Sequence, residues 1–275
     1  MEIQQSPLYA AYIRSLGWKV ELLDGMHVFI RPFPLIGGLA KIQRTTRLPA
    51  KTKLKALINK YRVRTIVIEP DSSVRQSDLS RWCHDMSKFV RINTDPFIPT
   101  KTIRVHLTGT EQEIFKKFTE AKQRAVRRAV KAGVTIRESD DAETMIRLKN
   151  KSAGILGFIT TAGISKLWRI LPPKNKTILL AYDENEKVVG AVLLIYCNST
   201  AYYWIAGALP KGKKLFAPTL LVWEALKIAK KQGMNYFDFV GAWDERIPDK
   251  NLEWKGFTKF KEGFGGEPLY YPLPS

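Results

Sequence analysis

Cysteine and histidine are scarce in this chain. Only Cys83 and Cys197, and His27, His84 and His106, occur among 275 residues. The two cysteines lie far apart and form no metal-binding pattern, so we expect both to be reduced thiols of an intracellular protein. The histidines show neither HxxxH nor HExxH spacing. The sequence therefore argues against a zinc site and against a Ser-His-Asp triad.

Long hydrophobic runs and phosphate-binding glycine loops are also missing. The opening stretch MEIQQSPLYAAY has no charged start followed by an apolar core, so we expect no signal peptide. No run of about 18 apolar residues occurs, which predicts no membrane span. Neither G-x-x-x-x-G-K-[ST] nor G-x-G-x-x-G is present, so ATP or dinucleotide chemistry has no support. We expect a cytoplasmic protein.

Acidic residues are in the minority, with 26 Asp and Glu against 45 Lys and Arg, a formal charge of +19. An excess of this size argues for a polyanionic partner. Nucleic acid, an anionic membrane surface and a phosphate-rich substrate all qualify, and a merely basic surface is the plainer alternative. Apolar residues make up 45% of the chain, so it is globular.

The first hundred residues predict a small mixed unit over residues 1–98. A short helix begins at Ser6-Pro7, and the segments WKVELL and MHVFIRPF alternate as strands across the Asp24-Gly25 turn. Next come a helix over 51–61, a strand ending at Glu69-Pro70, a helix over QSDLSRWCHDM and a strand KFVRIN. The segment DPFIPTKT reads as a linker.

A second unit is predicted over residues 99–266. Its expected elements are a strand TIRVHL, one helix over 111–131, a strand VTIRES, helices over 141–154 and 165–171, and a hairpin turning at 183–185. A strand ending at Gly207, a lysine loop, a helix from Pro218 to Gly233, a strand over 236–240 and a Phe-Lys turn ending in Gly265-Gly266 follow. This mixture predicts an α/β (α+β) fold and excludes a doubly wound parallel sheet.

The helix expected over 111–131 has two faces. An apolar stripe recurs at three- and four-residue steps: Ile114, Phe118, Ala121, Ala125 and Ala129. Another face carries cations with little acid to offset them: Lys117, Arg124, Arg127, Arg128 and Lys131. We expect this face to contact a phosphate backbone, although a solvated surface is the common alternative. The PKGKK segment adds Lys211, Lys213 and Lys214 on a loop expected to be mobile.

Two acids and an aromatic segment are candidate site residues. Asp238, on an apolar strand, must have a partner, and structural pairing is as good an explanation as catalysis. Glu69 ends a strand and is a second weak candidate for a general base. The segment YYW, which begins at Tyr202, either stacks on bases or sugar or simply fills the core.

Lys261 is the sharpest candidate. It follows Phe260 in FTKFKEGFGG, and a lysine on a tight glycine-rich turn is a compact cation suited to developing negative charge. The alternative is a surface lysine beside phenylalanines that fill the core.

The order of these segments resembles the Fem (FemABX) family of aminoacyl-tRNA-dependent transferases. The resemblance rests on QSPLYA with LGWKVE at the start, QRAVRRAVKAGV in the middle, and FAP, YFDFVG and FKEGFG at the end. It implies two acetyltransferase-like (GNAT-like) domains, the first reduced, its sheet completed by the tail 267–275. It also implies that Phe260 and Lys261 act at the aminoacyl ester, and that Glu69 lies near the substrate cleft. We place Arg14, Tyr203 and Tyr236 at the acceptor.

The expected function follows from that resemblance. The chain would move an amino acid from aminoacyl-tRNA to an amine of a UDP-linked or lipid-linked peptidoglycan precursor, as a monomer, with an anionic membrane as a further contact. The ester is already activated, so no cofactor or metal is expected. The segment GFITTAGISKLW lacks the arginine expected for a nucleotide-linked precursor, so the acceptor can differ. The alternatives are an acyl-CoA-dependent N-acyltransferase and a non-enzymatic RNA-binding protein.

Overall fold

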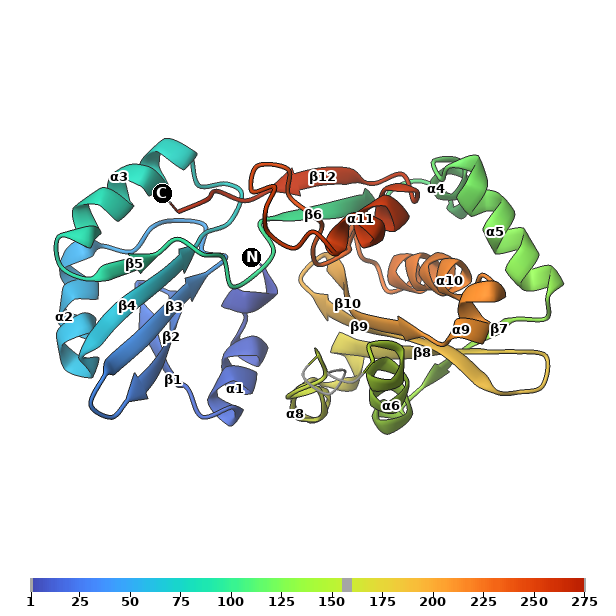
Figure 1. Ribbon diagram of the computed structural model, residues 1–275, viewed down its shortest axis with the longest axis horizontal. Helices are drawn as coiled ribbons and strands as arrows, with labels where there is room; N and C mark the ends of the chain where they lie inside the picture. Colours follow the sequence, from blue (N-terminus) through green and yellow to red (C-terminus); the bar gives the residue numbers. More distant parts are fainter. Residues whose placement is uncertain (1, 155–159, 275) are drawn as a thin grey trace. The chain divides into compact units, whose positions relative to one another are not determined.

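The chain folds into two compact units, each built on its own mixed sheet (Figure 1). The computed structural model describes residues 2–154 and 160–274. One unit comprises Met1–Lys101 with Leu269–Ser275, and the other Thr102–Pro268. Helices and strands alternate in both units, which confirms the predicted mixed α/β class.

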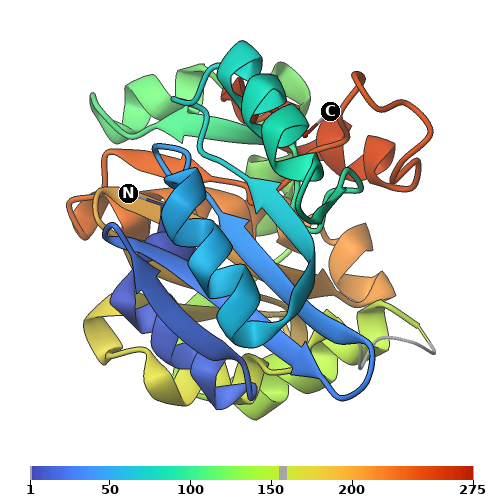
Figure 2. The same cartoon turned by 90° about the vertical axis from the view of Figure 1, so that its left-hand side faces the viewer.

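The first unit has a five-stranded sheet in the order β1-β2-β3-β4-β5. Strands β1 to β3 are antiparallel, and β3, β4 and β5 are parallel. Its elements are η1 (Ile3–Gln5), α1 (Pro7–Ser15), β1 (Lys19–Leu23), β2 (Met26–Phe33), β3 (Gly37–Gln43), α2 (Lys51–Tyr61), β4 (Val63–Glu69), α3 (Gln76–Ser87) and β5 (Arg91–Asn93). Helix α1 packs on β1 and β2, α2 on β4 and α3 on β5 (Figure 2).

Strand β3 is an element that the sequence reading missed. Its GGLAKIQ segment begins with two glycines and has a lysine among its apolar residues, so its strand pattern is weak. The structure pairs it with β2 on one side and β4 on the other, and its Ala40 and Ile42 are fully buried. Tertiary pairing here outweighs local propensity.

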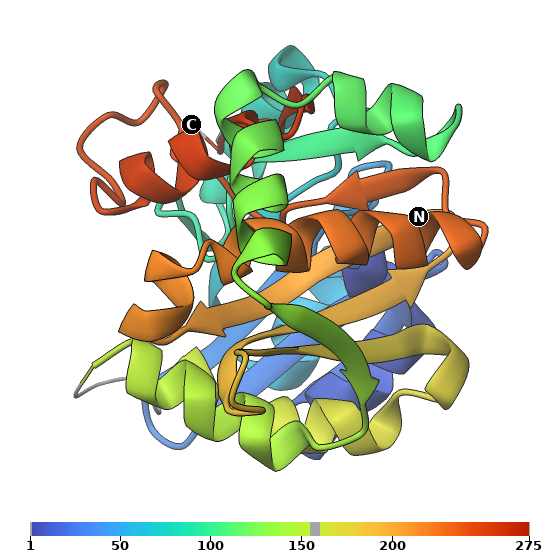
Figure 3. The same cartoon turned by 90° about the vertical axis from the view of Figure 1, so that its right-hand side faces the viewer.

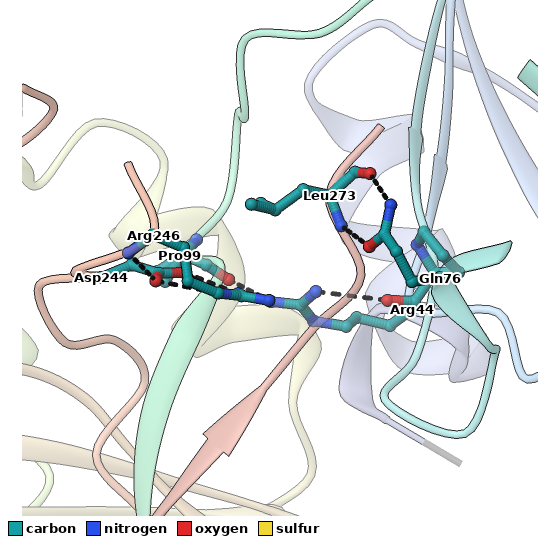
Figure 4. Close-up of polar contacts among 7 residues, drawn as sticks. Arg44, Gln76, Pro99, Asp244, Arg246 and Leu273 are labelled. Atoms are coloured by element: carbon teal, nitrogen blue, oxygen red, sulfur yellow. Dashed lines mark hydrogen bonds and ion pairs between the residues drawn. The ribbon is translucent and has the colours of Figure 1, made fainter. Parts of the chain in front are cut away.

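The C-terminal tail does not complete the first sheet, so that expectation is wrong. Strand β12 (Glu267–Tyr270) lies at the edge of the other sheet, beside β6. What the tail gives the first unit is polar contact: Gln76 donates through Nε2 to the Leu273 carbonyl (2.7 Å) and accepts the Leu273 N–H at Oε1 (2.9 Å) (Figure 4). In the same unit the Arg44 guanidinium donates to the Pro99 carbonyl (2.5 Å).

The second unit has a seven-stranded sheet in the order β12-β6-β11-β10-β9-β8-β7. Its other elements are β6 (Lys101–His106), α4 (Glu111–Lys116), α5 (Glu120–Lys131), β7 (Thr135–Ser139), α6 (Ala142–Ser152), α8 (Ile164–Ile170), η2 (Pro173–Asn175), β8 (Lys176–Tyr182), β9 (Val188–Cys197), β10 (Thr200–Ala208), α9 (Pro210–Lys214), α10 (Ala217–Lys231), β11 (Tyr236–Asp238) and α11 (Trp254–Glu262). Strand β9 is buried from Val189 to Tyr196 because helices cover both faces: α10, which also packs against α5, and α6 (Figure 3).

Three local expectations in this unit are corrected. The helix predicted over 111–131 is interrupted after α4, because Phe118 turns into the core against Trp223 and Phe264 and the Thr119 N–H donates to the Gly263 carbonyl. The buried stripe accordingly includes Val126 but not Ala121, which is exposed.

The other two corrections concern the lysine-rich segments. PKGKK is not a mobile loop but the short helix α9, in which Gly212 is buried against the Val189 carbonyl. FTKFKE is not a strand and turn but the last part of α11, and Phe260 within this helix packs against Phe264 just beyond its end (5.1 Å between ring centroids). The spacing of its phenylalanines fits the helical period.

Candidate functional site

The candidate site lies at the point where strands β10 and β11 stop pairing. The two parallel strands are in register only from Thr200–Tyr236 to Tyr202–Asp238. Beyond that point β10 continues to Ala208 alongside β9, with a bulge at Trp204, whereas the Phe239 N–H already donates to the Ile103 carbonyl of β6. Ligands of open sheets bind at such carboxyl ends, where neighbouring strands part, and bulges are frequent there.

The turn that follows β11 holds a strained backbone. Val240 has a φ of 57°, a left-handed conformation that is costly for a β-branched residue. Residues in such conformations persist only where the surroundings hold them, and they concentrate at functional sites. We call residues 239–241 the divergence turn.

Asp238 holds the divergence turn from one side. Its carboxylate is 3% exposed and accepts hydrogen bonds from Thr102 Oγ1 (2.6 Å), Arg104 Nε and Nη2 (3.1 and 3.0 Å) and the Val240 N–H (2.7 Å). Thr102 in turn accepts the Gly241 N–H (3.2 Å). The predicted partner of Asp238 therefore exists, and this network favours a positioning role over proton abstraction.

Lys261 holds the same turn from the other side. It lies in the last turn of α11, not on a glycine-rich turn, and its ammonium donates to the carbonyls of Phe239 (3.0 Å) and Gly241 (2.5 Å). One N–H remains for another acceptor. Burial lowers the pKa of Lys261 to about 8; Asp238 opposes this shift and Lys149 adds to it.

Two further lysines belong to this region, and only one of them was predicted. Lys149 is on α6, which packs so closely on β10 that a Cβ at Gly207 would lie 3.1 Å from the Lys149 Cα. Burial lowers the pKa of Lys149, and the charge of Lys213 on α9 lowers it further. Among the described residues neither lysine forms an ion pair, so Lys149, Lys213 and Lys261 together create a positive field suited to an anion.

The remaining lysines of PKGKK differ from one another. Lys211 forms an ion pair with the buried carboxylate of Asp183 (2.5 Å), which also accepts the N–H groups of Asn185 and Lys187. Lys211 therefore anchors the β8–β9 turn. Lys214 is exposed.

Of the predicted aromatic residues of this unit, Tyr202 lies in the core and Tyr203 packs against it while partly buried. The Tyr203 ring packs against Phe237 and Phe239 (5.9 and 5.5 Å), and burial raises its pKa. Tyr202 is 4% exposed. Tyr236 is half-buried, with its ring edge on His106 and the Arg104 guanidinium over it. A role for Tyr203 or Tyr236 at the acceptor stays a prediction.

Phe260 stacks with a cation that the sequence reading passed over. The Lys122 ammonium lies 3.8 Å from the Phe260 ring centroid, and burial lowers the pKa of Lys122 to about 8. This contact ties α5 to the end of α11, next to Lys261. No sequence signal separates Lys122 from its neighbours, because only the packing of α5 on α11 distinguishes it.

The predicted basic face lies on α5 and at the C-cap of α4, and it is open to solvent. All five of its cations are exposed: Lys117, Arg124, Arg127, Arg128 and Lys131. Arg124 pairs with Glu120 (3.1 Å), an exposed interaction of small energy. Arg127 contacts only Gln123 and the Phe115 ring among described side chains.

Two candidates lie in the first unit. Glu69 ends β4, is 4% exposed, and accepts hydrogen bonds from Gln43 Nε2 (2.6 Å) and from the N–H groups of Phe97 (2.6 Å) and Ile98 (2.9 Å). Arg14 is exposed in the last turn of α1. No three His, Cys, Asp or Glu side chains within 2–154 and 160–274 are grouped to hold a metal, and no helix there is long and apolar enough to cross a membrane.

Comparison with known proteins identifies the family. The model of the acetyltransferase (GNAT) domain matches residues 116–256, which is just over half of the chain. The chain belongs to this family. The matched segment contains the β10–β11 divergence and its turn. No curated protein sequence matches at a significant level.

Solved structures extend the likeness to both units. The crystal structure of FemX is 16% identical, with a TM-score of 0.75 over 98% of this chain and 90% of that one. L-PGS from Bacillus licheniformis is 14% identical (TM-score 0.56; 98% and 92% covered), and a tandem GNAT protein from the clavulanic acid pathway is 10% identical (0.55; 90% and 77%). These likenesses confirm, at the level of the fold, the expected resemblance to the Fem family and the pair of GNAT-like domains.

Proposed function

We propose that this GNAT-family acyltransferase takes its acyl group from aminoacyl-tRNA and moves the amino acid to an amine of a peptidoglycan-precursor stem peptide. The observation that carries the proposal is the basic face. Five exposed cations, four along α5 and one at the C-cap of α4, of which only Arg124 is in a weak ion pair among the described residues, fit a polyphosphate backbone much longer than a single nucleotide. The structural likeness to FemX supports the same donor.

The start of α10 argues against the pyrophosphate of an acyl-CoA donor. Free N–H groups at a helix N-terminus are the usual protein cradle for phosphate. Pro218 has no N–H, and the N–H groups of Thr219 and Leu220 both donate to the Phe216 carbonyl. Little of that first turn is left to bind an anion.

The reaction that we propose is aminolysis of an ester. The neutral acceptor amine attacks the ester carbonyl, and a C–N bond forms as the carbonyl oxygen becomes an oxyanion. The C–O bond to the ribose then breaks, and the proton lost by the amine ends on the ribose oxygen. Lys261 supplies the charge that stabilises the oxyanion, because two of its N–H groups already fix its position. Asp238 and Thr102 keep the turn beneath it in place.

An acyl-CoA-dependent N-acyltransferase is the second candidate. It is favoured by the lysine cluster at the β10–β11 divergence, since Lys149, Lys213 and Lys261 could hold a pyrophosphate without a helix N-terminus. This candidate needs no basic face on α5.

The deciding experiment gives the protein both donors in parallel. One arm contains a mixed pool of aminoacyl-tRNAs with UDP-linked and lipid-linked muropeptides, and the other acetyl-CoA with the same acceptors. We expect a mass increase of one amino-acid residue in the tRNA arm and no release of free CoA thiol in the other. Thiol release with no aminoacylated product would favour the second candidate. Binding of tRNA without transfer to any amine would support a non-enzymatic RNA-binding protein.

A further inference from the structure

The turn between β2 and β3 exposes an unusual number of apolar side chains. Leu35 is fully exposed, Ile36 is 69% exposed and Phe33 is 41% exposed. The turn is at the lower right of Figure 2. These three side chains add little to the core of the unit, and contiguous apolar groups on a surface commonly mark an interaction site.

The backbone of this turn makes the choice of residues more informative. Leu35 has a φ of 70°, which favours glycine or asparagine at this position. Pro32 and Pro34, which flank Phe33 just before Leu35, restrict the chain further. A polar turn residue would cost less in conformation and in solvation, so nothing in the first unit's own folding explains an exposed leucine here.

Unpaired cations lie at the same end of the sheet. The Gly38 N–H donates to the Arg62 carbonyl (2.8 Å), and the Arg64 side chain lies against Gly37. Arg91 is in register with Thr65 on the next strand. Within the part of the chain that the structure describes, Arg62 and Arg64 are exposed and neither they nor Arg91 form an ion pair. A second apolar group, Phe89, is 57% exposed there, with the Lys55 ammonium 3.2 Å from its ring centroid.

The carboxylates of Glu21 on β1 and Asp85 on α3 are already paired with other side chains and do not cancel this charge. Glu21 is engaged with Lys60 and Tyr61, and Asp85 with Lys51. This end of the first unit thus combines projecting aliphatic side chains with a surrounding group of free guanidinium groups. We call it the β2–β3 tip: Phe33, Leu35 and Ile36 with Arg62, Arg64 and Arg91.

We propose that the β2–β3 tip binds the surface of an anionic phospholipid membrane, with Leu35 and Ile36 inserted among the acyl chains and the arginines on the lipid phosphates. Shallow insertion of apolar side chains plus attraction to anionic lipid is the usual basis of peripheral binding. Guanidinium groups suit phosphate because they donate in pairs. RNA would use the arginines but not the two aliphatic side chains, which offer no stacking surface. The inference is independent of the acyl donor.

The test is flotation of the full chain with vesicles of phosphatidylcholine alone or mixed with phosphatidylglycerol. We expect the wild-type protein to float only with the anionic vesicles. The double variant Leu35→Ser with Ile36→Ser should lose at least about tenfold in affinity, because it removes the inserted apolar groups. Arg62→Gln with Arg64→Gln should weaken binding and reduce its salt dependence.

The matched control is Leu22→Ser. Leu22 is an exposed apolar residue (65%) on β1 beside the β1–β2 turn, at the opposite end of β2 from the β2–β3 turn. This control should bind vesicles as the wild type does. All variants should keep the wild-type melting temperature. The double variant Leu35→Ser with Ile36→Ser should also keep the wild-type affinity for tRNA. The proposal is overturned if the wild type fails to float with anionic vesicles, or if Leu35→Ser with Ile36→Ser floats as well as the wild type. It is also overturned if Leu22→Ser loses as much vesicle binding as that double variant does.

Discussion

Each unit of this protein buries a carboxylate at the end of a strand with a parallel neighbour, but the two ends are built differently. At Glu69 the neighbouring strand β3 stays in register to the last residue, and its Gln43 side chain donates to the acid. At Asp238 the neighbouring strand β10 leaves, and the acid holds a strained turn together with Lys261. A buried acid alone therefore does not mark a site; the parting of the strands beside it does.

The groups that donate hydrogen bonds to the two acids also differ in charge. Within residues 2–154 and 160–274, the side-chain and backbone donors that hydrogen-bond to the Glu69 carboxylate are neutral, namely the Gln43 amide and two backbone N–H groups, and the charge of Lys41 acts on it without a hydrogen bond. Asp238 is paired with Arg104, and lysines lie on the other side of the turn that it holds. The arrangement at Asp238 concentrates positive charge at the point where β10 and β11 part. A developing oxyanion requires positive charge placed in this way.

The largest expected effect is on the rate of transfer in Lys261→Met. Loss of one preorganised oxyanion partner costs on the order of a hundred- to a thousand-fold, or roughly 3–4 kcal/mol. We expect this fall with both substrates still bound, as measured by single-turnover transfer and by tRNA binding. Lys259→Met, an exposed lysine on the same helix, is the control. A rate above about a tenth of wild type would leave Lys261 as a holder of the turn only.

The two acids should differ next in stability. Asp238→Asn removes the buried charge that Arg104 pairs with at 3.0 Å, so we expect the free energy of unfolding to fall by about 2–4 kcal/mol. Glu69→Gln should cost only about 1 kcal/mol, because the new amide can still accept both backbone N–H groups while Gln43 reverses its own amide. Chemical denaturation measures both. Equal losses would contradict the difference that we draw between the two strand ends.

A smaller effect is expected on tRNA affinity. Reversing charge at Arg124 and Arg127 to Glu should weaken binding about tenfold or more, equally for charged and uncharged tRNA, because phosphate contacts release counterions. The slope of affinity against salt should become shallower. Lys174→Glu with Lys187→Glu, two exposed lysines elsewhere in the same unit, should have little effect. A flat salt dependence of the wild-type protein would exclude phosphate contacts as the main term.

The smallest effect concerns the strain itself. Val240→Gly removes the β-branched side chain from its left-handed conformation, so we expect the melting temperature to stay the same or rise slightly. The turn loses rigidity, and the transfer rate should drop by roughly three- to tenfold. Melting and rate measured on one preparation separate the two. A marked loss of stability would show that packing, not strain, governs this position.

Much of the fold was predictable because its elements have strong local patterns. The Asp24-Gly25 hairpin, the helix over 51–61 and the helix that starts at Pro218 all follow from alternation, helical period and proline position. Strand β3 and the break between α4 and α5 were missed because tertiary contacts decide them. The glycines of β3 and the buried Phe118 have no local signature that outweighs their neighbours.

The site was predictable only in part. Lys261 and Asp238 came from one short segment each, and the structure brings both to the divergence turn. Thr102, Arg104 and Lys149 were missed because the register of β6 with β11 and the packing of α6 on Gly207 determine where they lie. The parallel register of β10 with β11 explains why Tyr203 packs against the core, since it places the ring beside Phe237 and Phe239.

The pH dependence of transfer tests the account most directly, as the ratio of wild-type rate to the rate of Lys261→Met. Titration of the acceptor amine affects both proteins and cancels in the ratio. Because burial lowers the pKa of Lys261 to about 8, the ammonium is present below that pH and is lost above it. We predict a ratio that is flat below about pH 8 and then falls about tenfold per pH unit, with Lys122→Met behaving as the wild type does. A ratio that stays constant through pH 8 to 10 would contradict the assignment of the oxyanion charge to Lys261.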